Sequence, residues 1–293
     1  MLWIPVTIGA ATLQVARNAA QRSVMTGAGP WGATLVRFLF GLPFALLFVG
    51  ILWLATPGAR FHPSAAFFLA CLAGAGLQMA ATASMLTAMQ RSSFALGTAM
   101  QQSGLPFALV WGVLFFGDHV GPLVWLGGGI ATLGLTALSW PRGGAVHMQR
   151  GAVLFGLGSG AMFALSANFF RQGALALDPN HLVLSAFATV AVVQAIQTVS
   201  LGGWLLATNR TAVIAVVAAW RRSLGAGFCG AAASGLWFTA MALSPVGPVR
   251  AVGVIEMPIA ALVGRRLFAE RLSLLQWAAG GLTAAGVVLA ATG

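Results

Sequence analysis

Residues 122–138 read PLVWLGGGIATLGLTAL, and residues 274–290 read LLQWAAGGLTAAGVVLA. Trp125 falls on Trp277, 152 residues later, and the same shift places Gly134 on Gly286. The match continues upstream without gaps, where Thr87-Ala88-Met89 falls on Thr239-Ala240-Met241, Pro106 on Pro258, Gly112 on Gly264 and Asp118 on Glu270. A weaker match, with a shift of 150 residues, places Asn18 on Asn168. Self-similarity over this length indicates a duplicated chain.

The composition indicates that lipid covers the duplicated chain. Of its 293 residues 59% are hydrophobic and only 6% are charged, and its mean hydropathy is +0.92. A soluble domain carries about 25% charged residues, so a surface this apolar has to be buried in a bilayer. All 15 basic residues are arginines, and most lie at the ends of apolar runs, where they anchor helix ends. They form no basic stripe, and nucleic acid is not an expected partner.

Charges, prolines and glycine turns divide the chain into ten apolar runs of the length that a membrane helix needs, about 20 residues. These runs are 3–23, 31–55, 64–89, 94–116, 121–140, 151–172, 181–207, 222–243, 246–267 and 272–291. The stretch 208–221 is apolar but short, and we expect an interfacial segment there. Residues 1–14 lack a charged leader, which favours a first helix over a signal peptide. The sequence thus predicts an all-α, multi-pass integral membrane protein.

The number of helices in each copy has a geometric consequence. Residues 1–143 and 147–293 form two predicted repeats of five helices each. Because five is odd, the second repeat starts on the opposite side of the membrane, and the two repeats are inverted about an axis in the membrane plane. Inverted repeats around a central cavity are a common plan of secondary transporters, with the substrate site near the bilayer midplane. Some channels share this plan.

Several short motifs occur in a fixed order along both copies. Residues 35–38 read LVRF, residues 101–106 read QQSGLP before Gly117-Asp118, and residues 256–258 read EMP before the run FAERL at 268–272. Together they resemble the drug/metabolite transporter (DMT) superfamily, and within it the EamA-type ten-helix exporters. Asp118 stands where this family usually has Glu, and Ala269 stands where it has a second Gly.

The resemblance implies a basket-shaped fold in which helices 1–4 and 6–9 line a central cavity. It also implies a bacterial inner-membrane protein that exports amino acids or related metabolites, as the YddG-type aromatic amino acid exporters do. We therefore expect a small-molecule substrate, alternating access, a monomer or weak homodimer, and no cofactor. Export of cationic drugs or of other metabolites is the alternative that the resemblance leaves open.

Polar side chains inside a membrane cost several kcal/mol unless they are paired, so they mark candidate sites. The candidates for substrate binding are Gln14, Arg17, Asn18, Gln78, Gln101, Gln102, Trp111, Asn168, Gln194, Trp237 and Glu256. Helices 5 and 10 hold almost none. Each candidate has an alternative role, because amides also join helices by hydrogen bonds, tryptophans pack at interfaces, and Arg17 and Arg37 lie near enough to helix ends to reach the interface. Arg37 is also placed to bind a substrate carboxylate.

Glu256 is the one acidic residue inside a predicted helix. It lies two residues before Pro258, which leaves a backbone carbonyl without its helical partner. We expect it either to bind a substrate amine or to titrate during coupling, and the alternative is an ion pair with Arg17 or Arg250. Pro43, Pro106 and Pro258 are the expected kinks.

Enzymatic chemistry is not expected. Ser234 lies in a short motif loosely similar to that of rhomboid proteases, but the four histidines lie in loops or at a helix end, and Asp118 and Asp178 lie in separate loops. Cys71 and Cys229 are too few for a metal site or a disulfide framework.

The arginines leave the orientation open. Eleven lie on one side of the predicted topology and three on the other. This distribution places both termini outside by the positive-inside rule, whereas the family resemblance implies termini in the cytoplasm.

Overall fold

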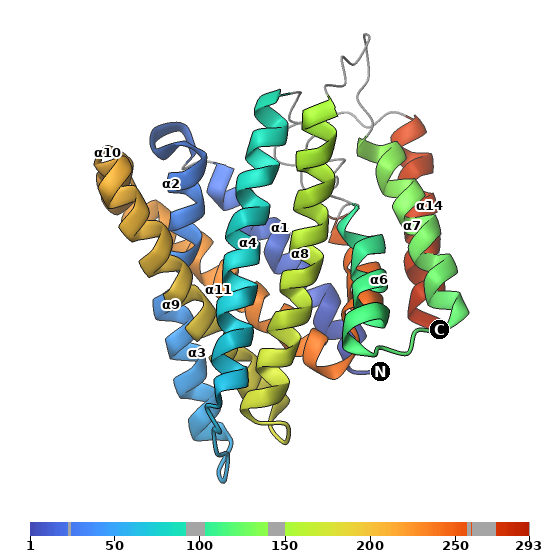
Figure 1. Cartoon of the computed structure of the whole chain (residues 1–293), viewed down its shortest axis with the longest axis horizontal. Helices are drawn as coiled ribbons and strands as arrows, with labels where there is room; N and C mark the ends of the chain where they lie inside the picture. Colours follow the sequence, from blue (N-terminus) through green and yellow to red (C-terminus); the bar gives the residue numbers. More distant parts are fainter. Residues whose placement is uncertain (23–24, 92–102, 140–149, 257–258, 260–273, 293) are drawn as a thin grey trace. The chain divides into compact units, whose positions relative to one another are not determined.

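A computed structural model describes residues 1–22, 25–91, 103–139, 150–256, 259 and 274–292, and all regular structure in these ranges is helical (Figure 1). The described residues form two compact units. The first unit contains residues 77–168 and 244–293 with Met1, and the second contains residues 2–76 and 169–243. Each unit draws helices from both predicted repeats, 1–143 and 147–293, so the repeat boundary stays a prediction.

The second unit contains most of the long helices. Its complete helices are α1 (Trp3–Arg22), α2 (Met25–Leu39), α3 (Leu42–Ala55), α9 (Leu182–Thr208), α10 (Arg210–Ala218) and α11 (Trp220–Leu243). It also takes the first part of α4 (Ala65–Arg91) and the last part of α8 (Arg150–Leu177). The predicted runs 3–23, 181–207 and 222–243 thus correspond to helices within two residues at each end. The short stretch 208–221 contains α10, whose first turn is capped by the side chain of Asn209 accepting from the Ala212 N–H.

The predicted run 31–55 is not one helix but two. Helix α2 ends at Leu39, and α3 begins at Leu42 with Pro43 in its first turn. Proline fits there because the first N–H groups of a helix have no intrahelical acceptor. A side chain at Gly41 would collide with the backbone carbonyl of Arg37, so only glycine fits at this break. The expected kink at Pro43 is therefore a break centred on Phe40 and Gly41.

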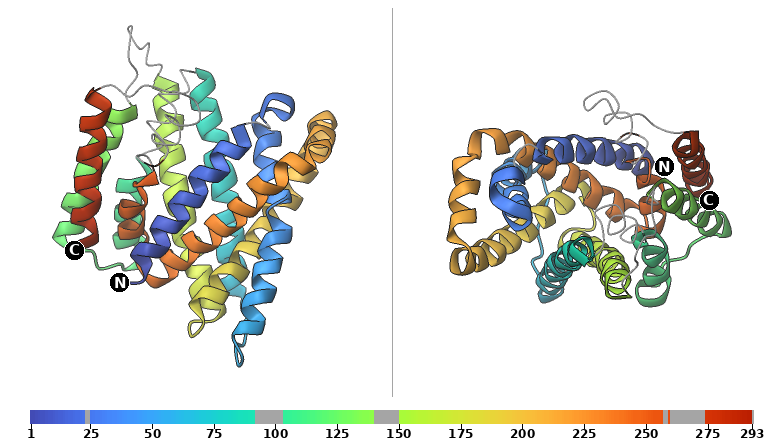
Figure 2. Two further views of the ribbon diagram at one scale, coloured as in Figure 1. Left: turned by 180° about the vertical axis from the view of Figure 1, so that it is seen from behind. Right: turned by 90° about the horizontal axis from the view of Figure 1, so that it is seen from above.

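Helix α11 is the centre of the second unit. Helix α1 runs antiparallel along it, since Gly9 of α1 lies against Leu236 whereas Arg17, two turns later, lies against Gly230 (Figure 2). The opposite side of α11 packs on α9, where the ring of Phe187 fills the space over Gly235. Small residues on α11 thus allow helices on two sides to approach closely.

The first unit contains the remaining helices. These are α6 (Gly104–Phe116), α7 (Pro122–Ser139), α12 (Val246–Gly253) and α14 (Leu274–Thr292), with the last part of α4 and the first part of α8. Helix α6 ends at Gly117, whose φ of 67° is the left-handed conformation that glycine favours at helix ends. The Asp118 N–H then bonds to the Gly112 carbonyl at 3.0 Å and closes this end.

Helices α7 and α14 pack by a reciprocal contact. A Cβ at Gly134 would lie 2.7 Å from the Thr283 nitrogen and 2.9 Å from the Ala279 carbonyl oxygen. A Cβ at Gly286 would collide with the Ala131 nitrogen and lie 2.6 Å from the Gly127 carbonyl oxygen. Shifting each residue of the first contact by 152 positions produces the second contact. Gly127, early in α7, contacts Gly286, whereas Gly134, later in α7, contacts Ala279, which comes earlier in α14. The two helices therefore run antiparallel, as Figures 1 and 2 show.

Five segments of the described chain are long and apolar enough to cross a membrane. They are Thr34–Ala55, Ala65–Met85, Val153–Leu177, Leu182–Thr208 and Trp220–Leu243. Three shorter helices are also apolar, namely Gly104–Phe116, Pro122–Ala137 and Trp277–Thr292. Large apolar side chains such as Leu54, Val199 and Leu133 are mostly exposed, which suits a lipid environment. These findings indicate a membrane protein, while the count of ten spans and the inversion stay predictions.

The α7–α14 contact leads to a first prediction. Replacing Gly286 with Ala inserts a methyl group against the backbone of Ala131 and Gly127, and neither backbone can move away easily. We expect the free energy of unfolding to fall by about 1–3 kcal/mol, measured by thermal unfolding in detergent followed by tryptophan fluorescence. Gly281→Ala on the same helix is the matched control, because its Cβ meets no atom within 4 Å. Equal stability of the two variants would contradict the contact.

Candidate functional site

Gln14 and Trp237 meet in the second unit. The Trp237 indole Nε1–H donates to the side-chain oxygen of Gln14 at 3.1 Å, joining α11 to α1. Trp237 is buried, whereas Gln14 is half-buried. Both were candidates for substrate binding, and the structure brings them together across 223 positions of sequence.

Two arginines pack against one glycine near this pair. A Cβ built on Gly230 would lie 3.3 Å from Cδ of Arg17 and 3.8 Å from Cγ of Arg37. Arg17 comes from α1 and Arg37 from α2, so the stems of two cationic side chains from different helices converge on α11. Arg17 is only 7% exposed. Its guanidinium is therefore held inside the protein rather than at a fully solvated helix end.

Gln194 of α9 lies at the break between α2 and α3. Its side-chain oxygen and nitrogen lie 3.0 and 3.3 Å from the position of a Cβ on Gly41. The side chain is 3% exposed, and neither amide atom has a hydrogen-bond partner among the described residues. One turn along α9, the Thr198 hydroxyl oxygen is also buried and has no hydrogen-bond partner among the described residues. A buried amide left unsatisfied costs about 1–3 kcal/mol, so this position is expensive unless a bound molecule completes it.

The contacts of α11 connect these groups into one region, which we call the α2–α3 site. It comprises Arg17, Arg37, Gly41, Gln194, Thr198, Gly227 and Gly230. Gly227 lies directly against the backbone of Phe40, the residue before Gly41, and Gly230 lies one turn further along α11. All of these residues belong to the second unit. The site is thus built from residues of α1, α2, α9 and α11 around the interruption between α2 and α3.

Trp111 belongs to the first unit and has a different environment. Its indole N–H donates to the backbone carbonyl of Ala161 at 3.2 Å, which joins α6 to α8. Its ring stacks on Phe107 with centroids 5.6 Å apart and lies tilted against Phe115 at 5.3 Å. In the same unit the Ser159 hydroxyl donates to the Ala81 carbonyl at 2.8 Å and joins α8 to α4. These contacts are those of helix packing.

The other candidates of the first unit lie on three helices. Gln78 is half-buried on α4, and its carbonyl accepts from Thr82. Asn168 is 1% exposed on α8, and its amide nitrogen donates to the Ala164 carbonyl at 3.1 Å. Glu256 is helical and half-buried, and its charge acts on the guanidinium of Arg250. Arg250 is one of the two arginines named as ion-pair partners in the alternative role of Glu256, and that ion pair stays a prediction.

Some candidates lie outside the described residues. Gln101, Gln102 and Pro258 are among them, as is the side chain of Asn18. Pro106 is described, and it lies in the first turn of α6. Proline fits there because its missing N–H would have no intrahelical acceptor at this position.

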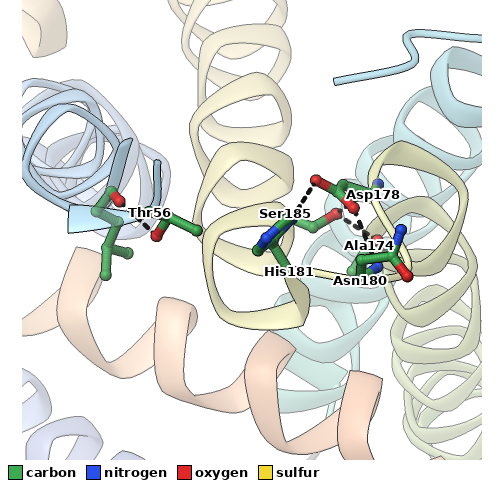
Figure 3. Close-up of polar contacts among 7 residues, drawn as sticks. Thr56, Ala174, Asp178, Asn180, His181 and Ser185 are labelled. Carbon is green, nitrogen blue, oxygen red and sulfur yellow. Dashed lines mark hydrogen bonds and ion pairs between the residues drawn. The ribbon is translucent and has the colours of Figure 1, made fainter. Parts of the chain in front are cut away.

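The turn between α8 and α9 holds a cluster of polar side chains (Figure 3). The Asp178 carboxylate accepts from the Asn180 N–H at 3.0 Å and lies 2.8 Å from His181 Nδ1. The Ser185 hydroxyl donates to the Ala174 carbonyl and accepts from the Asp178 N–H. Ser185 is thus bonded to backbone, and His181 to Asp178. The cluster closes the turn and satisfies the Ala174 carbonyl near the end of α8. It does not have the serine–histidine contact that nucleophilic catalysis needs.

The Asp178 carboxylate stabilises this turn when it is ionised. Burial acts to raise its pKa, but the hydrogen bond with His181 and the Asn180 N–H together outweigh this effect. The positive charge of His181 and the backbone of Arg60 act in the same direction, and the pKa of Asp178 is lowered below the usual 3.8. Because the folded-state pKa is depressed, the ionised form stabilises the fold above pH 3.8, and this stabilisation is lost as the pH falls through the folded-state value.

The sequence did not indicate how glycines would organise the α2–α3 site. Gly41, Gly227 and Gly230 were not among the candidates, although each removes a side chain where another helix or an arginine stem must approach. Their signal is present in the sequence, since glycines inside apolar helices mark close approach. Arg37 was noted as a polar residue of its helix, but only the fold shows that it shares one region with Gln194.

Comparison with known proteins shows the fold alone. No family description matches the sequence, and no curated protein is detectably similar to it. A solved structure described as "Crystal structure of protein" is similar over 99% of this chain and 96% of its own, with a TM-score of 0.71 and 14% identity. At this identity the similarity concerns the arrangement of helices, and it identifies neither a substrate nor an activity.

The hydrogen bond between Trp237 and Gln14 leads to a second prediction. A double-mutant cycle of Gln14→Leu and Trp237→Phe should give a coupling free energy of about 0.6 kcal/mol, and up to about 1.7 kcal/mol, as measured for such bonds in membranes. The measurement is unfolding in mixed micelles. Trp111→Phe combined with Gln14→Leu is the control cycle, because the Trp111 N–H bonds to the Ala161 backbone. A coupling no larger than that of the control would contradict the contact.

The Asp178 turn leads to a third prediction. At pH 7 the wild type should unfold at a higher temperature than Asp178→Asn, because only the carboxylate accepts hydrogen bonds from the Asn180 N–H and from His181 with a full negative charge. This difference should shrink as the pH falls below 3.8 and the carboxylate takes up a proton. Unfolding temperatures measured from pH 7 to pH 3 test it, and a difference that stays constant over this range would contradict the account.

Proposed function

We propose that this chain is a secondary transporter of the drug/metabolite transporter superfamily, of the EamA type, in the inner membrane of a bacterium. It exports small metabolites, first of all amino acids with neutral or aromatic side chains, by alternating access. The proposal rests on one observation above the others. Strongly polar groups, including the Arg17 guanidinium and the Gln194 amide, are buried among helices whose length and composition suit a membrane. Such groups are expensive in hydrocarbon and mark solute pathways.

The packing of α7 and α14 supports the inverted repeat that this proposal needs. The contacts of Gly134 and Gly286 are exchanged by the same 152-residue shift that aligns the sequence, and the two helices are antiparallel. Two copies related by an axis in the membrane plane would produce this pattern. Ten spans and two opposed five-helix repeats, 1–143 and 147–293, follow from the proposal.

The break between α2 and α3 also supports the proposal. Transporters build their substrate sites at interrupted helices, where helix ends and unwound backbone face the solute. The interruption at Phe40 and Gly41 lies within the apolar segment Thr34–Ala55, next to buried polar side chains. A purely structural helix bundle has no need for this arrangement.

Counterflow in proteoliposomes tests the proposal. The full chain is reconstituted and loaded with excess unlabelled solute, and uptake of the labelled solute is followed for a panel of amino acids, sugars, nucleosides and cationic drugs. We expect saturable counterflow of at least one amino acid. Saturable uptake of cationic drugs alone would favour the alternative substrate class, whereas flux that does not saturate would indicate a channel. Empty liposomes are the control.

Glu256 leads to a fourth prediction. Glu256→Gln keeps the size of the side chain and removes the charge that acts on Arg250. We expect the counterflow rate to fall at least about tenfold, which corresponds to about 1.4 kcal/mol, while elution in size exclusion stays that of the wild type. Unchanged kinetics in this variant would remove Glu256 from the transport site.

A further inference from the structure

We infer that the α2–α3 site binds the carboxylate of the transported solute, and that this group is what the transporter recognises. This inference rests on the proposed function and specifies the substrate class as compounds that carry a carboxylate. It concerns residues of the second unit only: Arg17, Arg37, Gly41, Gln194 and Thr198.

The first support is the start of α3. This helix is 14 residues long and begins directly after Gly41, which is buried. The first turn of a helix carries a partial positive charge, because its N–H groups point away from the helix without intrahelical acceptors. A buried helix start of this kind favours an anion.

The second support is independent of the helix start. The Gln194 amide points at Gly41, is 97% buried, and has no hydrogen-bond partner for either polar atom among the described residues. An amide nitrogen donates to a carboxylate oxygen, and the amide oxygen accepts from an ammonium group. An α-amino acid carries both groups on one carbon, so a single solute of this class satisfies both atoms of Gln194. The Thr198 hydroxyl, one turn along the same face, supplies a further donor.

The third support is charge. Arg17 and Arg37 converge on Gly230, on the helix whose Gly227 touches the α2–α3 break. The stems of two cationic side chains thus lie against the same helix that contacts the break before α3. Arginine binds carboxylates through two parallel hydrogen bonds, and its five N–H donors allow it to keep other contacts at the same time.

Other solute classes fit these groups less well. A cation without an acidic group would meet two arginines and a positive helix end, which repel it. An apolar solute would leave both atoms of Gln194 unsatisfied. A carboxylate is complementary in charge to the helix start and to arginine, and it accepts a hydrogen bond from the Gln194 amide nitrogen.

The test compares solutes that differ only in the carboxylate. Wild-type proteoliposomes are assayed by counterflow and by competition with L-phenylalanine, L-phenylalaninamide, phenethylamine and 3-phenylpropionate, and with the leucine series L-leucine, L-leucinamide and 4-methylpentanoate. We expect the acids to compete at least about tenfold more strongly than the corresponding amides and amine. Competition by 3-phenylpropionate would show that the carboxylate suffices, and competition by the amino acid alone would show that the ammonium group is also read.

Variants assign the effect to the site. Gln194→Met preserves length and removes the amide, and Arg37→Gln removes one charge. Each should raise the KM of the acid at least about tenfold and leave competition by the amide unchanged. Arg60→Gln is the matched control, because it removes the same charge from an exposed position of the same unit. Gln194→Met removes a group without a partner and should fold normally, which keeps the test decisive if Arg37→Gln is unstable.

The outcomes separate this inference from the proposed function. If no solute of either panel shows saturable counterflow, the proposed function fails and this inference fails with it. If counterflow is saturable but acids and amides compete equally, transport stands and carboxylate recognition is wrong. If Gln194→Met and Arg37→Gln impair acid and amide alike, or neither, these residues do not bind the carboxylate.

Discussion

A polar group in the hydrocarbon core of a membrane has to find its hydrogen-bond partner within the protein, because lipid offers none. Several threonines of this chain meet this constraint locally. The hydroxyls of Thr7, Thr132 and Thr283 donate to the carbonyl four residues earlier on the same helix, at 2.7, 2.7 and 2.8 Å. A threonine in an apolar helix is therefore inexpensive and needs no function. Amides and guanidinium groups carry more polar atoms than one such bond satisfies, as in Asn168, whose amide nitrogen donates to the Ala164 carbonyl of its own helix. Their remaining polar atoms need partners from elsewhere.

The distribution of these larger groups separates two kinds of packing. Where helices α7 and α14 meet, glycines bring their backbones together at Gly127, Gly134 and Gly286. In the second unit some glycines serve a further purpose. Gly230 makes room for two arginine stems, and Gly41 faces the Gln194 amide. The same residue type thus permits tight helix contact in one unit and polar convergence in the other.

Much of the helical structure could be predicted from the sequence, because hydropathy and turn residues act locally. The ends of α1, α9 and α11 lie within two residues of the predicted runs. The break between α2 and α3 was not predicted as such, because hydropathy runs continuously from Thr34 to Ala55 and Pro43 indicated only a kink. The α2–α3 site was predicted in part. Arg17 and Gln194 are conspicuous in apolar runs, but their convergence on Gly230 and Gly41 depends on how distant helices pack, which no local pattern encodes.

Access of water to Gln194 tests the central claim most directly. Cys71 and Cys229 are first replaced by Ser, and the variants Gln194→Cys and Val199→Cys are treated in membrane vesicles with a charged, membrane-impermeant thiol reagent. Both positions lie on α9, but Val199 is 74% exposed and suited to contact lipid, whereas Gln194 is buried. We predict that the reagent labels the thiol at position 194 and that a transported amino acid protects this thiol from labelling. The thiol at position 199 should stay unlabelled. An inert thiol at 194 in all conditions would contradict a solute pathway through the α2–α3 site.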